Sequence, residues 1–119
     1  MPPKFKDNLA YKQAELLLQP TFIRVLDNIR KQTEISDWES SYEEIAQPFP
    51  GYLLSLKKEE RVLKFNVWDL CFQICFVNYD PSQNNIVEID ANLIDEQGEL
   101  DWQSLENKTQ KIVQNIFNN

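Results

Sequence analysis

Cys71 and Cys75 carry the most nucleophilic side chains of a sequence that contains no histidine. Both lie within residues 70–77, an almost continuously apolar run that predicts a central β-strand. Cα atoms four residues apart on a strand are roughly 13 Å apart, too far for a disulfide bond, whereas on a helix the two residues would be neighbours. We therefore expect two free thiols that pack as small apolar side chains, as is typical of a protein in a reducing compartment.

The absence of histidine removes the usual general base near neutral pH, together with the Ser-His and Cys-His pairs of many hydrolases. Two cysteines spaced as on a strand do not provide the four ligands of a tetrahedral zinc site. Gly51 and Gly98 are the only glycines, which disfavours a glycine-rich phosphate-binding loop. The sequence predicts no catalytic residue, no metal ion and no cofactor.

Residues 90–101 are rich in carboxylates and invite a calcium-binding interpretation. An EF-hand loop with its glycine at Gly98 would begin at Leu93 and end at Ser104, so both its first and its twelfth ligand positions lack a carboxylate. A turn followed by a helix cap accounts for the same residues, and we favour that interpretation.

A second group of carboxylates contains Asp37, Glu39, Glu43 and Glu44. Paired carboxylates act as acid and base only where an apolar pocket separates their pKa values. Residues 34–51 show no hydrophobic period, and we interpret them as a solvated loop.

Hydrophobic periodicity predicts helices at both ends of the chain. A first helix is capped near residue 8 and continues to about residue 19, and Pro20 opens a second helix that continues to about residue 33. A last helix starts at Asp101 or Ser104 and carries a long apolar stripe.

Period-two alternation predicts strands at residues 52–57, 62–68 and 86–91, and the apolar run 70–77 adds a fourth. A bulge near Asp69 would place the large apolar side chains of the strands 62–68 and 70–77 on the same face of the sheet. We predict an α+β fold with two N-terminal helices, a four-stranded antiparallel meander sheet and a C-terminal helix, the helices lying on one face of the sheet. The length of 119 residues fits a single domain that spans residues 1–119.

The predicted core combines apolar side chains of the strands and helices. It consists of Leu26, Ile29, Leu63, Phe65, Val67, Phe72, Ile74, Phe76, Val87, Ile89, Ile112 and Ile116. Trp38 and Trp102 are expected to pack within the protein as well.

The chain carries 19 acidic and 12 basic residues, a net charge of −7 that repels phosphate backbones and anionic lipids. We therefore predict neither a nucleic-acid nor a membrane partner. No leader-like segment and no run of about 18 apolar residues is present, so we expect a cytoplasmic protein.

Trp68 is the leading candidate for a binding residue. Strand alternation places it on the face that carries Lys64 and Asn66, and beyond the predicted bend that face continues to Gln73. Tryptophan joins a large apolar area to one polar group and anchors many protein interfaces. We predict that Trp68, Asn66, Lys64 and Gln73 bind a partner, with a cover over Trp68 from residues 34–50 as the alternative.

Three segments carry a resemblance to a known group of proteins. Residues 7–25 resemble the opening of a small uncharacterised protein family of cyanobacterial genomes, and residues 67–72 and 93–102 strengthen the likeness. The resemblance implies a cytoplasmic setting and supplies no assigned activity, so no catalytic residue is carried over from it.

Three functional hypotheses fit these observations. The first is a non-enzymatic protein-interaction or assembly module that binds a protein partner or forms a homodimer. The second is a small-ligand-binding protein or an enzyme that uses Asp and Glu carboxylates, which requires a deep pocket with raised carboxyl pKa values. The third is an acidic inhibitor that masks a basic protein surface, which requires carboxylates gathered on one face.

Overall fold

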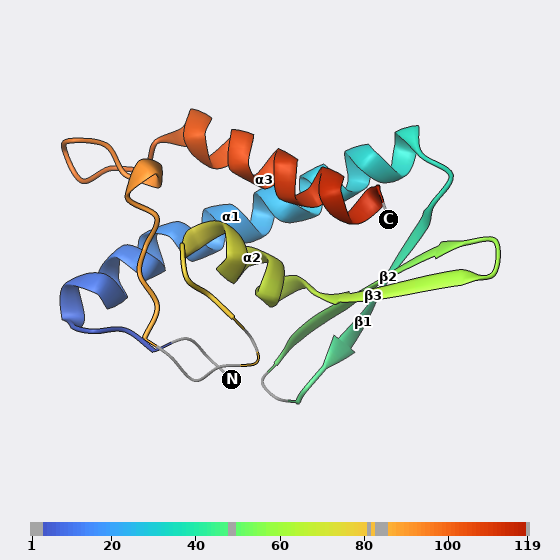
Figure 1. Cartoon of the computed structure of the whole chain (residues 1–119), viewed down its shortest axis with the longest axis horizontal. Coiled ribbons are helices and arrows are strands. Elements are labelled where there is room, and N and C mark those ends of the chain that lie inside the picture. The colour runs from blue at the N-terminus through green and yellow to red at the C-terminus, as the bar shows by residue number, and fades with distance from the viewer. Residues whose placement is uncertain (1–3, 48–49, 81, 83–85, 119) are drawn as a thin grey trace.

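The computed structural model describes residues 4–47, 50–80, 82 and 86–118 (Figure 1). The elements follow one another as α1 (Asn8–Ile35), β1 (Glu39–Ile45), β2 (Gly51–Lys58), β3 (Arg61–Asn66), α2 (Val67–Cys75), the short 3-10 helix η1 (Ala91–Leu93) and α3 (Trp102–Phe117). The predicted α+β class is confirmed. The number of strands and the positions of the helices both differ from the prediction, for reasons that follow from three segments.

The first segment is α1, which runs through Pro20 without interruption where two helices were predicted. Asp7 caps its first turn, because the carboxylate accepts a hydrogen bond from the backbone N–H of Ala10 at 2.8 Å. Proline removes one backbone donor and leaves the carbonyl of Leu16 without its helical partner. Leu16 itself is 44% exposed, and the helix continues past Pro20 to Ile35.

The second segment is β1, which occupies residues that were predicted to form a loop. It pairs antiparallel with β2, from Glu39 opposite Lys57 to Ile45 opposite Gly51, and gives the sheet the order β1-β2-β3. Both faces of β1 are mostly exposed, so its sequence shows no alternation of apolar and polar residues. Backbone pairing with β2, rather than burial, specifies this edge strand.

The predicted hairpin between the strands after residue 51 is confirmed. Lys58 pairs with Arg61, and Glu59 in the turn adopts the left-handed conformation with φ 56°. Cross-strand partners share a face, so Leu54 of β2 and its partner Phe65 of β3 lie together on the inner face of the sheet. That inner face is the side toward the helices.

The third segment is α2, which replaces the predicted central strand. Asn66 caps it, since its side-chain oxygen accepts hydrogen bonds from the backbone N–H groups of Trp68 at 2.9 Å and Asp69 at 3.4 Å. The helix contacts α1, α3, β2 and β3. A helix enclosed on so many sides has apolar residues around most of its circumference, which is why its sequence resembles a buried strand.

The predicted strand over residues 86–91 is also absent, and isolated bridges take its place. Ile86 pairs with Lys4 and Ile89 with Phe76, after which η1 begins. The backbone N–H of Asp90 donates to the carbonyl of Cys75 at 2.9 Å. These bridges hold the long connection between α2 and α3 against the end of α2 and the start of the chain.

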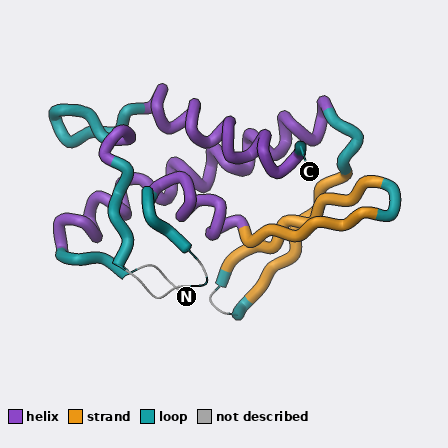
Figure 2. Tube along the Cα trace, viewed as in Figure 1, coloured by secondary structure: helices purple, strands orange, loops and turns teal. Residues whose placement is uncertain are grey.

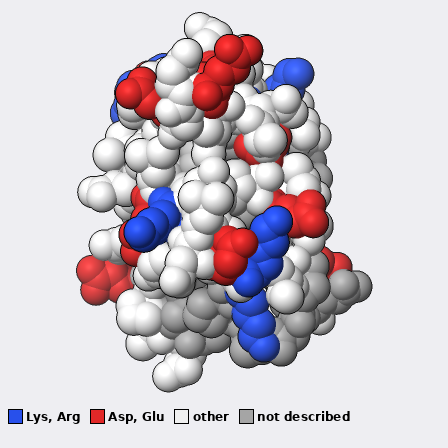
Figure 3. All heavy atoms as spheres, turned by 90° about the vertical axis from the view of Figure 1, so that its left-hand side faces the viewer, with Lys and Arg blue, Asp and Glu red and all other residues white. Residues whose placement is uncertain are grey.

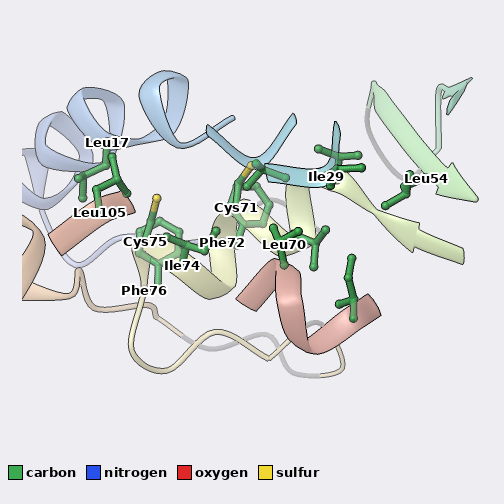
Figure 4. Packing of buried hydrophobic residues seen from close by; sticks show 14 of the residues in the cluster. Leu17, Ile29, Leu54, Leu70, Cys71, Phe72, Ile74, Cys75, Phe76 and Leu105 are labelled. Carbon is green, nitrogen blue, oxygen red and sulfur yellow. The ribbon is translucent and has the colours of Figure 1, made fainter. Parts of the chain in front are cut away.

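The core lies between the three helices and continues to the inner face of the sheet. Figure 4 shows Leu17 of α1, Leu105 of α3 and the side chains of α2 meeting in one cluster, with Ile29 and Leu54 toward the sheet. Of the predicted core, Ile29, Val67, Phe72, Ile74, Phe76, Val87 and Ile116 are buried, and Leu26, Leu63, Phe65, Ile89 and Ile112 are partly buried against it. The predicted core is thus confirmed although several of its elements are not.

The sheet sits at one end of the helical part of the molecule (Figure 2). Trp38, which follows α1, joins the two parts because its indole N–H donates to the carbonyl of Phe117 at 3.0 Å. Trp38 is only 4% exposed, as predicted. Several apolar side chains of α1, among them Leu9, Leu16 and Ile23, are exposed.

Candidate functional site

The four predicted binding residues do not share one strand face, and that premise is wrong. Lys64 is exposed on β3, Asn66 caps α2, and Gln73 is exposed on α2. Their role in binding a partner stays a prediction, without the common face that motivated it.

Trp68 is packed within the protein. Its ring stacks on that of Phe22 in α1, with centroids 4.9 Å apart, and lies 6.1 Å from the ring of Phe72. Gly51 of β2 is also close, since a methyl group added there would approach Cδ1 of Trp68 to 2.7 Å. Trp68 is therefore part of the packing between α1, α2 and β2.

The two cysteines are free and buried, as predicted. They lie one helical turn apart on the same side of α2, toward α1, so the predicted strand spacing is wrong (Figure 4). Burial raises the pKa of Cys75 to about 11, although the neighbouring Thr21 hydroxyl, 3.3 Å from its sulfur, partly opposes the shift. Burial also raises the pKa of Cys71 far above its usual range. Thiols of this kind are poor nucleophiles.

The carboxylates of residues 90–101 form turns and caps, as predicted. Asp95 accepts hydrogen bonds from the backbone N–H groups of Gln97 and Glu99, both at 2.9 Å, and Gly98 completes the turn with φ 79°. Asp101 caps α3 by accepting from the N–H of Ser104 at 3.0 Å. In the part of the chain that the structure describes, no group of three or more His, Cys, Asp or Glu side chains could hold a metal ion.

Trp102 lies beside a groove on the outside of the molecule and is 54% exposed, so the prediction that it packs inside is wrong. The groove has a volume of about 500 Å³. It is lined by Gln19, Pro20, Ile23, Arg24 and Asp27 of α1 together with Trp102 of α3.

Arg24 fixes the position of Trp102 in this groove. Its guanidinium carbon lies 4.9 Å from the centre of the indole ring, and its Nη1 lies 3.3 Å from Oε2 of Glu106. Asn28 donates to Oε1 of the same carboxylate at 3.3 Å. The cation between the ring and the carboxylate links α1 to α3 and holds the exposed indole against the groove.

The outer side of α1 also exposes a row of large aliphatic residues. Leu9 is 65% exposed, Leu16 44% and Ile23 60%. These residues are seven apart, which is close to two helical turns, so their side chains lie on nearly the same side of α1. Pro20 lies between Leu16 and Ile23 on the same side. We call the surface formed by Leu9, Leu16, Gln19, Pro20, Ile23 and Trp102 the α1 face.

Leu9, Leu16 and Ile23 were among neither the predicted core nor the predicted binding residues, so the α1 face was not predicted. α1 has one apolar stripe toward the core, which includes Leu17 and Val25, and a second one toward solvent. The seven-residue spacing of Leu9, Leu16 and Ile23 is the signal that distinguishes the second stripe.

Charge is distributed without a dominant region of one sign over the end of the molecule that Figure 3 shows, where acidic and basic side chains are interspersed. Helices long and apolar enough to cross a membrane are not found among the described residues.

Comparison with known proteins found no protein-family model, no curated protein and no solved structure that matches this chain.

Proposed function

We propose that this chain is a non-enzymatic, cytoplasmic protein-interaction module whose contact surface is the α1 face. The observation that carries the proposal is the exposure of Leu9, Leu16 and Ile23 in one row beside Trp102. Single exposed apolar residues are ordinary, but three large aliphatic residues on one side of a helix, with an exposed indole beside Ile23, are typical of a surface that a partner covers.

Energetics favour a protein partner. Complete burial of one Leu or Ile side chain stabilises a complex by about 1.5–3 kcal/mol, before the entropic costs of association. Tryptophan is among the residues that most often dominate the binding energy of an interface. A helix is a suitable partner element, since a row of aliphatic side chains beside a groove matches the apolar face of an amphipathic helix.

The groove is also prepared for binding by the contacts that hold Trp102. Because Arg24 and Glu106 restrain the indole, the ring loses little conformational freedom when a partner covers it. The aliphatic residues stand on a continuous helix and are positioned in the same way.

Carboxylate catalysis receives less support. The carboxyl groups with a displaced pKa are Asp27, Asp80 and Asp90, and each pKa lies below its usual value. A general acid at neutral pH needs a raised pKa.

A role as an acidic inhibitor is a second candidate, and β1 is the observation that favours it. Glu39, Glu43 and Glu44 are exposed on this edge strand. An acidic edge strand can pair with a strand of a basic partner through backbone hydrogen bonds. Lys57 lies directly opposite Glu39 on β2, which reduces the negative potential there.

Site-specific photo-cross-linking in the source cells tests the interaction module. A benzophenone side chain at position 23 should give cross-linked adducts of the folded chain, whereas the same probe at position 107, an exposed site on α3, should give none. Adducts at position 107 alone, or at neither position, would contradict the proposal. Adducts only from a probe at position 43 of β1 would favour the acidic inhibitor.

A further inference from the structure

We infer that the α1 face binds a second copy of this chain, with the two α1 helices antiparallel about a two-fold axis that passes between Gln19 and Pro20. The inference rests on the proposed function and names its partner. Three features of the described residues support it: the spacing of the aliphatic row, the sign of the charges beside it, and the shape of the groove.

The spacing of Leu16 and Ile23 makes the central part of the α1 face self-complementary. Leu16 and Ile23 are equidistant from the midpoint between Gln19 and Pro20. A two-fold axis at that midpoint sets Leu16 of each copy against Ile23 of the other, so both contacts are apolar. Seven residues of helix separate the two contacts by roughly 10 Å, and Gln19 and Pro20 of both copies fill the interval.

The charges select the antiparallel orientation. Lys12 precedes Leu16 by four residues and Asp27 follows Ile23 by four, so both stand on the same side of the helix as the aliphatic row. The two-fold axis places Lys12 opposite Asp27 at each end of the contact. A parallel alignment would instead place Lys12 beside its own copy, where the like charges repel each other.

Asp27 already has partners within the chain, and this limits what Lys12 adds. Its carboxylate binds Arg30 and Lys31, both at 2.9 Å, and Arg30 also binds Glu34 at 3.0 Å. These four groups sum to no net charge, so they neither attract nor repel Lys12 strongly at a distance. The charges therefore act mainly against a parallel pair, through the repulsion between the two Lys12 side chains, and the apolar contacts supply the affinity.

The groove accommodates the second copy. Leu16 of that copy meets Ile23, which lines the groove, while Trp102 stands at its edge and can cover the incoming side chain. A contact confined to one helix and one indole is small for a stable dimer. The net charge of −7 on each copy also opposes self-association, which weakens the dimer further. We therefore expect a dimer with a dissociation constant of about 1–100 µM.

Sedimentation velocity of the purified chain across this concentration range tests the partner. The wild type should shift from monomer to dimer, and Ile23→Glu should raise the dissociation constant by at least about tenfold. Asn107→Glu, at an exposed position of α3, should leave it unchanged. A chain that stays monomeric at about 500 µM overturns the inference.

Cysteine cross-linking under mild oxidation tests the orientation, since the native thiols are buried. Gln19→Cys lies beside the axis and should form a disulfide between copies. Leu9→Cys lies far from the axis and should not, because the antiparallel arrangement sets it opposite Arg30. Cross-linking of both variants would indicate a parallel pair. Cross-linking of neither, or of the control variant Asn107→Cys alone, would place the interface elsewhere. Each of these outcomes overturns the inference.

A charge exchange provides the third test. Lys12→Asp and Asp27→Lys should each weaken the dimer, and the double variant should recover much of the loss, because the opposite charges again face each other. Circular dichroism checks that α1 remains helical in all three, and a double variant no tighter than the single ones contradicts the pairing.

The two proposals can fail separately. Photo-adducts at position 23 that contain only other proteins, together with a monomeric purified chain, would refute the second copy and leave the interaction module intact. Absence of any adduct at position 23 would refute both.

Discussion

The ring of Trp68 stacks on the ring of Phe22 with centroids 4.9 Å apart and planes inclined by 21°. This contact joins the first turn of α2 to the middle of α1. It gives Trp68 a role opposite to that of Trp102, whose ring is held at the surface by Arg24. Substitution of the two tryptophans therefore distinguishes a residue that stabilises the fold, Trp68, from one that is proposed to bind a partner, Trp102.

Trp68→Ala should lower the free energy of unfolding by about 2–4 kcal/mol, because it removes a partly buried ring and its stacking contacts. Trp102→Ala should lower it by less than about 1 kcal/mol, since the ring is more than half exposed. Urea unfolding followed by circular dichroism measures both.

Association should show the reverse order, with Trp102→Ala weakening the dimer and Trp68→Ala leaving it unchanged under conditions where the variant is folded. Equal stability losses for the two variants would contradict the assignment of Trp68 to the packing.

Gly51→Ala should destabilise the protein by about 1–3 kcal/mol. The added methyl group would approach Cδ1 of Trp68 to 2.7 Å, so the indole has to shift from its position in the stack with Phe22. Gly98→Ala is the matched control for steric contact, because nothing lies within 4 Å of its added methyl group and any loss there comes from its φ of 79° alone.

The two glycine variants are distinguished by tryptophan fluorescence. Gly51→Ala should change the emission of the folded protein through the displaced Trp68, whereas Gly98→Ala should leave it as in the wild type. An unchanged spectrum and unchanged stability for Gly51→Ala would contradict the prediction, because they would show that the added methyl group does not displace the indole of Trp68.

The sequence predicted which residues are buried better than it predicted their secondary structure. Ile74 and Phe76 are buried as expected, although the segment that carries Ile74 is a helix. Hydrophobicity reports burial directly, but a short apolar run that is enclosed on nearly all sides has no polar face from which to read a period.

A helix signal was nevertheless present in this segment. Asn66 precedes Asp69 by three residues, as in a capped first turn, and Asp69 and Gln73 are four apart on the same side of the helix. The strand β1 had no comparable signal, because its side chains are exposed on both faces and only its backbone pairing with β2 defines it. The α1 face could be found only after the core side of α1 was known.

Native Cys71 and Cys75 should react slowly with thiol reagents. Burial raises the pKa of Cys75 to about 11, so roughly one Cys75 thiol in a thousand is ionised at pH 8. Burial of both side chains also prevents the reagent from reaching the sulfur atoms. Reaction with a chromogenic disulfide reagent should therefore be slower by at least about 100-fold in the folded than in the urea-unfolded chain, which should take up two labels. Asn107→Cys, on the exposed side of α3, is the control for an exposed thiol, and a native rate close to that of this variant would contradict the burial of the thiols.

The ion pair between Lys108 and Asp90 ties α3 to the connection that follows α2, with Nζ 2.7 Å from Oδ2. Burial raises the pKa of Asp90, but Lys108 and the backbone N–H of Asn92 lower it more, so the net pKa lies below the usual 3.8. A carboxyl group whose pKa is lower in the folded state stabilises the protein above its unfolded pKa and loses this contribution as the pH falls through the folded value. The pair should therefore contribute fully above about pH 5 and progressively less below pH 4.

Asp90→Asn tests this dependence, because asparagine can still accept the hydrogen bond from Asn92 while it removes the charge. It should cost about 1–3 kcal/mol at pH 7, and the difference from the wild type should shrink as the pH falls below about 4. Lys108→Met leaves a carboxylate that is mostly buried and has no cation, so this variant should gain stability as acid protonates Asp90. Unfolding free energies measured from pH 7 to pH 3 for the three proteins give the comparison. A difference for Asp90→Asn that keeps its full size at pH 3 would mean that Lys108 does not lower the pKa of Asp90.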